Sequence, residues 1–317
     1  MKVTEIIKNS KKTLFSIEIV PPLRGNNIQG IYKKIDYLIE FKPVFINITY
    51  HKNEAVYKKH NDGTVETRIL SKRPGTVALT ASIMNKYNVE VIPHLTCGGF
   101  TKDQVENALI DFNFLGIENL LVLQGDAGHN QTEFIPEPEG HKYAVDLVKQ
   151  VVNMNNGKYL LEDMKQNNPS DFCIGVAGYP EKHYAATSLD EDIKHLKTKV
   201  DAGADYIITQ MFFDNKYYYD FVKKCRESGI TVPIIPGLKP IALKNQVEVL
   251  PRIFHTHIPD ELVKEINNCK NDEQALEIGT QWGIEQAKDL MANNAPVLHF
   301  YTLGAGNSIR KIAEKIF

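Results

Sequence analysis

The amino-acid sequence predicts a (β/α)8 barrel. Three observations support this fold class: eight short apolar segments are spaced along the chain, amphipathic segments separate them, and several are apolar on both faces. Strands buried on both faces are typical of parallel sheets, whose neighbouring strands need helical crossovers. Eight such units in 317 residues match a closed barrel. A doubly wound sheet is the alternative, because periodicity does not reveal closure, but no GxGxxG fingerprint follows any expected strand.

The expected strands are rich in Val, Ile and Phe. They cover residues 13–20, 43–50, 89–94, 119–124, 172–177, 204–210, 232–236 and 296–300. Helical spacing of apolar residues is found over 28–41, 66–87, 101–116, 141–153, 188–202 and 215–229. Extra helices are expected before the last strand, over 243–251, 259–269 and 272–293, and a closing helix from about 305.

Several helix ends carry local signals. The sequences 101–104 (TKDQ) and 188–191 (SLDE) have the capping-box pattern that starts a helix. Gly116, Gly203 and Gly229 lie where helices should end. Two polar insertions, 125–142 and 153–170, are expected on the barrel surface. Without an internal repeat or a linker, residues 1–317 are predicted to form a single domain.

Composition narrows the possible partners. The chain has 37 basic and 39 acidic residues, so no basic surplus suggests a nucleic-acid partner. No apolar segment approaches the roughly 20 residues that span a bilayer. The N-terminal sequence lacks the apolar core of a signal peptide, so a cytoplasmic location is expected. The four cysteines are far apart, which favours reduced thiols and predicts no metal site.

An acidic residue lies inside the first apolar segment. Glu18 is flanked by Ile17 and Ile19, and the segment stops at Pro21-Pro22. Alternation puts both isoleucines on one face of a strand and Glu18 on the other. If both faces are covered, lost solvation should raise the pKa of Glu18, as is common for catalytic acids. If the strand is an edge, Glu18 lies in water, and this segment alone leaves the two alternatives open.

Polar side chains collect at the carboxyl ends of successive expected strands. In a barrel these ends meet at one face, where the active sites of barrel enzymes are built. Any single polar end has a structural explanation, but six in succession indicate a functional site. They are Glu18, 47–51 (NITYH), 93–97 (PHLTC), 124–126 (QGD), 177–183 (AGYPEKH) and 208–213 (ITQMFF).

These motifs resemble the methylenetetrahydrofolate reductase family over nearly the whole chain. The motifs are SIEIVPP, NITY, PHLTC, QGDA, GVAGYPEKH, KVDAGADYIITQMFFD, IIPGLKP and HFYTLG. The resemblance implies FAD-dependent reduction of 5,10-methylenetetrahydrofolate to 5-methyltetrahydrofolate, which supplies methyl groups for methionine synthesis. NADH or NADPH gives the hydride in a ping-pong sequence, with NADH favoured for a short bacterial-type chain. It also implies a catalytic barrel without a regulatory domain, and a homo-oligomer.

The resemblance assigns roles to individual residues. Glu18 occupies the position of the general acid that protonates N10 of the folate, and Asp126 and Gln210 complete the catalytic set. Substrate contacts are expected from Glu18, Thr49, Asp126, Gln210 and Gln246, although Gln246 could equally be a solvated helix residue. Expected FAD contacts are Thr49, Tyr50, His94, Gln124, Gly125, Asp126, Tyr143, Ala144, Tyr179, His183, Asp192 and Lys199.

The chain departs from the usual family motifs at several positions. Gln124 stands where an arginine is common, and Thr198 stands where an arginine often precedes Lys199. The motif HFYTL is followed by Gly-Ala where Asn-Arg is usual, so an arginine expected at the folate's glutamate tail is missing. Arg310, in the next helix, is the candidate replacement.

Two other functions are compatible with a pterin-binding barrel. One is a flavin-free enzyme that transfers a methyl group or condenses a pterin, and the other is a catalytically dead binding scaffold. Flavin colour that bleaches with a reduced nicotinamide would exclude the flavin-free enzyme. The scaffold fits poorly with intact Glu18, Asp126 and Gln210.

Overall fold

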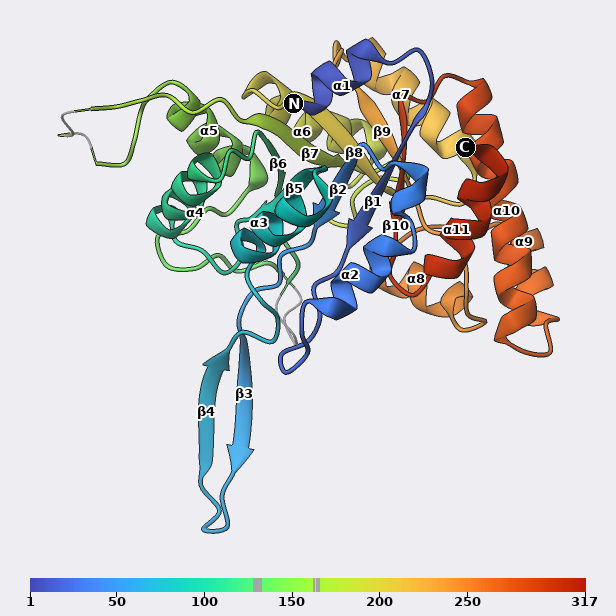
Figure 1. Ribbon diagram of the computed structural model, residues 1–317, viewed down its shortest axis with the longest axis horizontal. Coiled ribbons are helices and arrows are strands. Elements are labelled where there is room, and N and C mark those ends of the chain that lie inside the picture. The colour runs from blue at the N-terminus through green and yellow to red at the C-terminus, as the bar shows by residue number, and fades with distance from the viewer. Residues whose placement is uncertain (128–132, 162, 164–165) are drawn as a thin grey trace.

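The computed structural model describes residues 1–127, 133–161, 163 and 166–317 (Figure 1). Eight parallel strands form a closed barrel, which confirms the predicted fold class, and β10 closes it against β1. A doubly wound open sheet is therefore excluded. Every expected strand begins and ends within two residues of an observed one. The barrel strands are β1 (Leu14–Ile19), β2 (Phe45–Ile48), β5 (Glu90–Thr96), β6 (Asn119–Leu123), β7 (Cys173–Gly178), β8 (Tyr206–Met211), β9 (Ile234–Leu238) and β10 (Val297–Tyr301).

Helices surround the barrel, and three of them lie between β9 and β10, as predicted (Figure 1). The helices before β9 are α1 (Val3–Asn9), α2 (Gln29–Asp36), the 3-10 helix η1 (Ile39–Phe41), α3 (Thr76–Tyr87), α4 (Lys102–Phe114), α5 (Ala144–Asn155), α6 (Leu189–Asp201) and α7 (Asn215–Glu227). Those after β9 are α8 (Gln246–Phe254), α9 (Asp260–Asn267), α10 (Asp272–Ala292) and α11 (Gly306–Ile316).

Local capping explains where two helices begin. At α4 the box is complete, because Thr101 Oγ1 accepts from the Gln104 amide while Gln104 Oε1 accepts from the Thr101 amide. At α6 the box is only half formed. Ser188 Oγ accepts from the Glu191 amide, but the Glu191 carboxylate accepts from Thr187 instead of Ser188. The prediction of a full capping box at 188–191 is therefore wrong in one half, because Glu191 bonds the residue before Ser188.

The prediction of one helix over residues 66–87 is wrong in its first part. Only Thr76–Tyr87 is helical, and a hairpin precedes it, with β3 (Glu54–Lys59) paired antiparallel to β4 (Val65–Leu70). The turn at 60–64 closes through the His60 amide and the Thr64 carbonyl, with Gly63 at a φ of +84°. The Asp-Gly pair in this turn is a hairpin signal that the helical reading overlooked. Figure 1 shows the hairpin extending away from the barrel.

Two apolar layers hold the barrel together. Between strands and helices, side chains such as Ile17 and Ile19 join one large buried cluster. The amino-terminal half of the interior is filled by a second cluster: Val3, Phe45, Ile92, Leu121, Cys173, Tyr206, Ile208, Ile235 and Val297. Val3 comes from α1, whose backbone amide donates to Asn119 Oδ1 at the start of β6. The amino end of the barrel is thus closed by α1, a helix for which the sequence carried no clear prediction.

Candidate active site

Glu18 lies at the carboxyl end of β1, on the strand face that lines the barrel interior. Its strand pairs with β10 on one side and β2 on the other, while Ile17 and Ile19 face the helices. The alternative of a wet edge strand is therefore wrong. The Glu18 side chain is 14% exposed, and its Oε2 lies 3.4 Å from His94 Nε2. Burial raises the pKa of Glu18 from 4.5 to about 8, as the two-faced strand predicts.

A buried polar layer lies next to Glu18 inside the barrel. It consists of Ser16, Asn47, His94 and His299, from four different strands, each at most 6% exposed. Ser16 Oγ is 2.9 Å from His299 Nδ1, and Asn47 Nδ2 is 3.3 Å from His94 Nε2. Asn47 Oδ1 and His299 Nε2 are buried without a hydrogen-bond partner among the described residues. Unpaired buried polar atoms are rare, so a bound molecule or water that reached them would gain hydrogen bonds.

The titratable groups of this layer are neutral at pH 7. Burial lowers the pKa of both His94 and His299 to about 3, and each also feels a neighbouring histidine. With Glu18 protonated and His94 uncharged, their 3.4 Å contact is not an ion pair. Burial dominates here because an ionised group loses its water and no opposite charge replaces it.

The end of β10 and the residue after it fix the backbone around Glu18. Thr302 donates to the Glu18 carbonyl through its amide at 3.3 Å and its hydroxyl at 2.6 Å. Tyr301 reaches over β9 and donates from its hydroxyl to the Thr209 carbonyl of β8, at 2.6 Å. A Cβ at Gly237 would lie 2.5 Å from the Tyr301 hydroxyl and 2.2 Å from the Thr209 carbonyl. The glycine of IIPGLKP therefore provides the space for this cross-strand bond.

The other two residues expected in catalysis, Asp126 and Gln210, and the expected substrate contact Thr49 lie at the ends of alternate strands of the barrel. Gln210 belongs to β8, and its Oε1 accepts from the Met211 amide at 2.9 Å. Its Nε2 has no hydrogen-bond partner in the described part of the chain. Asp126 follows β6, and Thr49 follows β2 and bonds His51 Nε2 at 3.0 Å. These side chains come from separate strands that end on the same face of the barrel.

A second group of expected cofactor contacts lies in the segment after β7 and on α6. The ring of Tyr179 lies 4.7 Å from that of His183, whose amide donates to Asp192 Oδ2 at 2.9 Å. Burial raises the pKa of Tyr179, and the charges of Asp192 and Asp126 add to the effect. Lys199 Nζ donates to the Ala177 carbonyl at 2.8 Å, and burial lowers its pKa to about 8. Lys199 has no ion-pair partner among the described residues.

The remaining expected cofactor contacts are more dispersed. Tyr50 packs against Phe100 and lines a cavity of about 240 Å³ at the base of the hairpin. Gln124 Nε2 donates to the Lys142 carbonyl at 2.8 Å, while Gly125 has a φ of +87°. Tyr143 is 52% exposed and precedes the first residue of α5, Ala144, without a capping hydrogen bond from its side chain. Part of the insertion between Gly125 and Lys142 lies outside the described residues, as does part of the 153–170 insertion.

Two expectations about the folate region can be compared with the structure. Gln246 is 9% exposed, and its Oε1 accepts from the amides of Ala242 and Leu243, so it is not a solvated helix residue. Arg310, the candidate replacement for the missing arginine, is engaged by other groups of the protein. Its guanidinium pairs with Glu40 and Glu314 and donates to the Tyr37 carbonyl, which anchors α11 to the α2–η1 region.

Sequence reasoning missed other buried polar groups. His299 is the first residue of the HFYTLG motif, yet nothing in the sequence pairs it with Ser16. Lys239, in IIPGLKP, is 2% exposed, and its Nζ bonds the Pro240 carbonyl at 3.0 Å. Burial lowers the pKa of Lys239 to about 8. The sequence signal that could have identified Lys239 is a single lysine inside the apolar segment IIPGLKP. Burial also raises the pKa of Glu181 to about 7.

None of the helices in the described residues is long and apolar enough to cross a membrane.

Comparisons with known proteins agree with these motifs. The family model described as methylenetetrahydrofolate reductase matches residues 2–316. "Methylenetetrahydrofolate reductase (NADH) 1" of Arabidopsis thaliana is 32% identical over 321 residues, covering 97% of this chain and 49% of that protein. "Methylenetetrahydrofolate reductase 1" of Schizosaccharomyces pombe is 30% identical over 308 residues, covering 96% and 46%. The chain thus spans about half the length of these plant and yeast relatives.

A bacterial relative is matched over most of its length. The "5,10-methylenetetrahydrofolate reductase" of Salmonella typhimurium is 31% identical over 291 residues, covering 91% of this chain and 85% of that protein. A solved structure from Clostridium thermocellum, titled as binding two copies of 5-methyl-5,6,7,8-tetrahydrofolic acid, has a TM-score of 0.58 at 15% identity over 98% of both chains. This structural likeness concerns the fold alone. By its match over almost every residue, the chain belongs to the methylenetetrahydrofolate reductase family.

Proposed function

We propose that this protein reduces 5,10-methylenetetrahydrofolate to 5-methyltetrahydrofolate, with FAD as cofactor and NADH or NADPH as the hydride source. The observation that carries the proposal is Glu18, an acid with a pKa of about 8 at the carboxyl end of β1. Membership of the family supports the same reaction. Self-association and a role in methionine synthesis belong to this proposal and rest on the family resemblance, and a cytoplasmic location is proposed with them.

The reduction of the folate requires a proton donor that is still protonated at neutral pH. The five-membered ring of the substrate opens when N10 is protonated and the N10–methylene bond breaks. At pH 7 an acid with a pKa of about 8 is roughly nine-tenths protonated, so Glu18 holds the required proton. A positioned general acid contributes roughly 10²–10⁴-fold to such a step.

The residues beside β7 and α6 fit an FAD dinucleotide. A bound FAD would accept hydride from the nicotinamide and deliver it to the opened folate. Lys199 offers a partly buried cation to a pyrophosphate, since it bonds only the neutral Ala177 carbonyl. Tyr179 and His183 offer flat ring faces to a ligand. These residues would hold the dinucleotide, together with Thr49 and the backbone at Gly125.

Gln210 suits a site that receives two substrates in turn. The Nε2 donor of an amide side chain can bond the carbonyl oxygen of a nicotinamide carboxamide or an acceptor on the edge of a pterin. Its Oε1 accepts from Met211, which leaves the Nε2 donor for a ligand. Asp126 is the proposed acceptor for the pterin's amino group. Gln246, with Oε1 engaged, would offer a folate its amide donor only.

Loading the protein with FAD and bleaching the flavin with a reduced nicotinamide distinguishes the proposed function from the flavin-free alternative. The purified protein, incubated with FAD and desalted, should be yellow and should bleach anaerobically with NADH or NADPH. Adding methylenetetrahydrofolate should then restore the colour. A protein that stays colourless after incubation with FAD would overturn the proposed function in favour of a flavin-free barrel.

A Glu18→Gln variant tests the assigned role of the acid. Nicotinamide-driven bleaching should keep its rate, because this half-reaction needs no proton from Glu18. Recovery of colour with methylenetetrahydrofolate should slow by roughly 10²–10⁴-fold. The exposed-acid variant Glu227→Gln, on α7, should match the wild type in both steps. Equal slowing of the two half-reactions in E18Q would contradict the assignment.

A further inference from the structure

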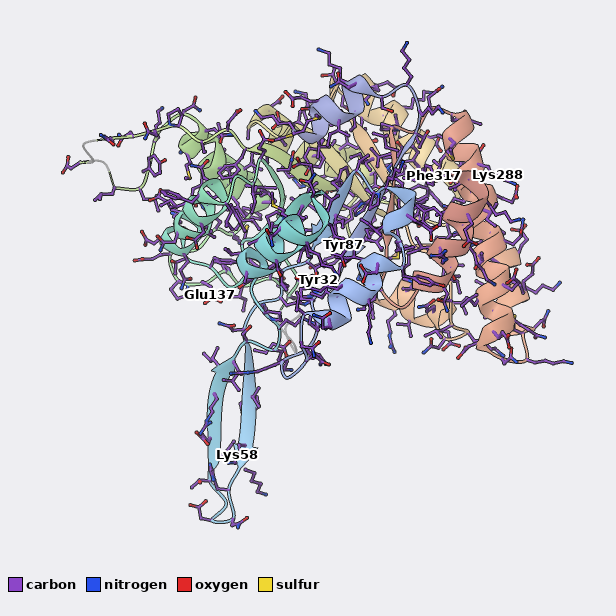
Figure 2. All side chains as sticks on the ribbon, in the orientation of Figure 1. Tyr32, Lys58, Tyr87, Glu137, Lys288 and Phe317 are labelled. Carbon is purple, nitrogen blue, oxygen red and sulfur yellow. The ribbon has the colours of Figure 1, made fainter. Side chains whose placement is uncertain are left out.

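The β3–β4 hairpin is a two-stranded sheet with two open edges. The two strands pair with each other, and neither pairs with a third strand in the described part of the chain. Figures 1 and 2 show it projecting from the carboxyl face of the barrel, with Lys58 well out along the arm. An isolated two-stranded hairpin is at best marginally stable in water, and an open strand edge is a template for pairing with another chain.

One face of the hairpin carries exposed apolar side chains. The register places Tyr57 opposite Thr67, and Val65 and Ile69 follow on the same face of β4. Tyr57 is 70% exposed, Val65 58% and Ile69 75%. This face would be covered if the sheet were extended by further strands whose own apolar residues continue it.

The sequence of β4 is complementary to itself about Thr67. Residues 65–69 read Val-Glu-Thr-Arg-Ile. When two copies pair antiparallel with their Thr67 residues opposite each other, Glu66 of each copy faces Arg68 of the other. Val65 of each likewise faces Ile69 of the other. Opposite charges and β-branched pairs are the cross-strand neighbours that stabilise antiparallel sheets.

The other edge lacks this symmetry. The charges of β3 are Glu54 at one end and Lys58 and Lys59 at the other. Pairing two β3 strands about their centre would match Glu54 with Lys59, but it would place Lys58 opposite Ala55. The charge pattern therefore selects β4 as the self-pairing edge.

We propose that the outer edge of β4 pairs with β4 of a second copy of this chain. The two hairpins form one four-stranded antiparallel sheet, with a two-fold axis through Thr67. The occupant of this edge is a second copy because the strand is complementary to itself in both charge and apolar character. The inference stands on the hairpin alone and does not depend on the reaction proposed above.

Cysteine cross-linking tests the register of this interface. Directly opposed residues in an antiparallel pair have Cα atoms about 4.5–5.5 Å apart, which a disulfide can span. Thr67→Cys should therefore form a covalent dimer when the full-length protein is oxidised with diamide. In Ile69→Cys, the two introduced thiols lie four residues apart along the pair, about 14 Å, and should not cross-link. The four native cysteines are buried, which keeps the background low.

The cross-linking outcomes are read on a non-reducing gel. Efficient dimer formation by T67C with little by I69C supports the proposed axis. Equal cross-linking by both variants indicates random collision and overturns it. No cross-linking by T67C, at a concentration where sedimentation shows wild-type dimers, also overturns it.

Charge reversal provides an independent test in sedimentation velocity. Wild type should show a species near twice the 35.9 kDa chain mass. Glu66→Arg or Arg68→Glu converts both inter-copy pairs into like charges, which should weaken dimerisation by roughly tenfold to thirtyfold. The double variant E66R/R68E restores opposite charges and should recover the dimer. Lys59→Glu, on β3, should leave it unchanged. A dimer lost in K59E and kept in E66R and R68E would overturn the β4 interface.

Discussion

Replacing Glu18 by glutamine should stabilise the folded protein while removing its acid. Glutamine keeps nearly the same shape and carries no ionisable proton. In the unfolded chain a glutamate is ionised above pH 4.5, whereas folded Glu18 keeps its proton to about pH 8. The contribution of Glu18 to stability is therefore greatest below pH 4.5 and falls as the pH rises towards 8. Each pH unit in this window costs the wild type about 1.4 kcal/mol.

The size of the effect follows from this window. At pH 7 the wild type has lost about 3 kcal/mol relative to low pH, and above pH 8 about 5 kcal/mol. The free energy of unfolding of E18Q has no such loss, because glutamine does not ionise. The difference in free energy of unfolding between variant and wild type should therefore grow with pH, reaching about 3 kcal/mol in favour of E18Q at pH 7.

Urea unfolding at pH 5, 7 and 8.5, followed by circular dichroism, measures this difference. The slope with urea should be the same for both proteins, so that the midpoints report stability directly. The control E227Q removes an exposed acid on α7 and should show no such growth with pH. A variant E18Q that is less stable than wild type at pH 7 would refute the reasoning. So would a stability difference that is constant from pH 5 to 8.5.

Three further predictions concern charged groups of the site. The folate half-reaction should fall tenfold per pH unit above about pH 8, where Glu18 loses its proton, while stopped-flow bleaching by nicotinamide should not follow that profile. Lys239→Met should raise the free energy of unfolding by about 3 kcal/mol below pH 8, because the buried ammonium is disfavoured, and urea titrations should show this gain vanishing between pH 8 and 10.5. Lys199→Ala should weaken FAD binding by roughly tenfold to hundredfold, measured by flavin retained after gel filtration, whereas the exposed Lys194→Ala on the same helix should not.

The barrel could be predicted from sequence because its signals are local. Each strand is a short apolar segment, and Gly116, Gly203 and Gly229 all have the positive φ typical of helix ends. Alternation around Glu18 also placed Ile17 and Ile19 together on the opposite face of β1, but it left open whether both faces are covered. The hairpin was missed because residues 66–70 also fit a helical pattern, and no local rule shows that these strands lie outside the barrel.

The polar layer could not be predicted because it depends on register. Ser16 meets His299 through the pairing of β1 with β10, two strands at opposite ends of the chain. Sequence motifs identify each strand separately, but they do not say which residues share a level inside the barrel. The contacts of Arg310 could not be predicted for a related reason. Its position shortly after HFYTLG in the sequence does not reveal that it forms an ion pair with Glu40 of η1.

The neutrality of His94 is what allows Glu18 to serve as an acid. A charged imidazolium 3.4 Å from the carboxyl group would form an ion pair and pull the pKa of Glu18 down. Burial prevents this by lowering the pKa of His94 to about 3, so that from about pH 4 upward the histidine is uncharged while Glu18 keeps its proton to about pH 8. The same burial that destabilises ionised Glu18 therefore also removes the charge that would have stabilised it. Burial of Glu18 thus lowers the stability of the barrel by several kcal/mol above pH 7 and keeps a proton at its carboxyl end. If Glu18 is the acid of the proposed reaction, this is a trade between stability and activity that E18Q would reverse.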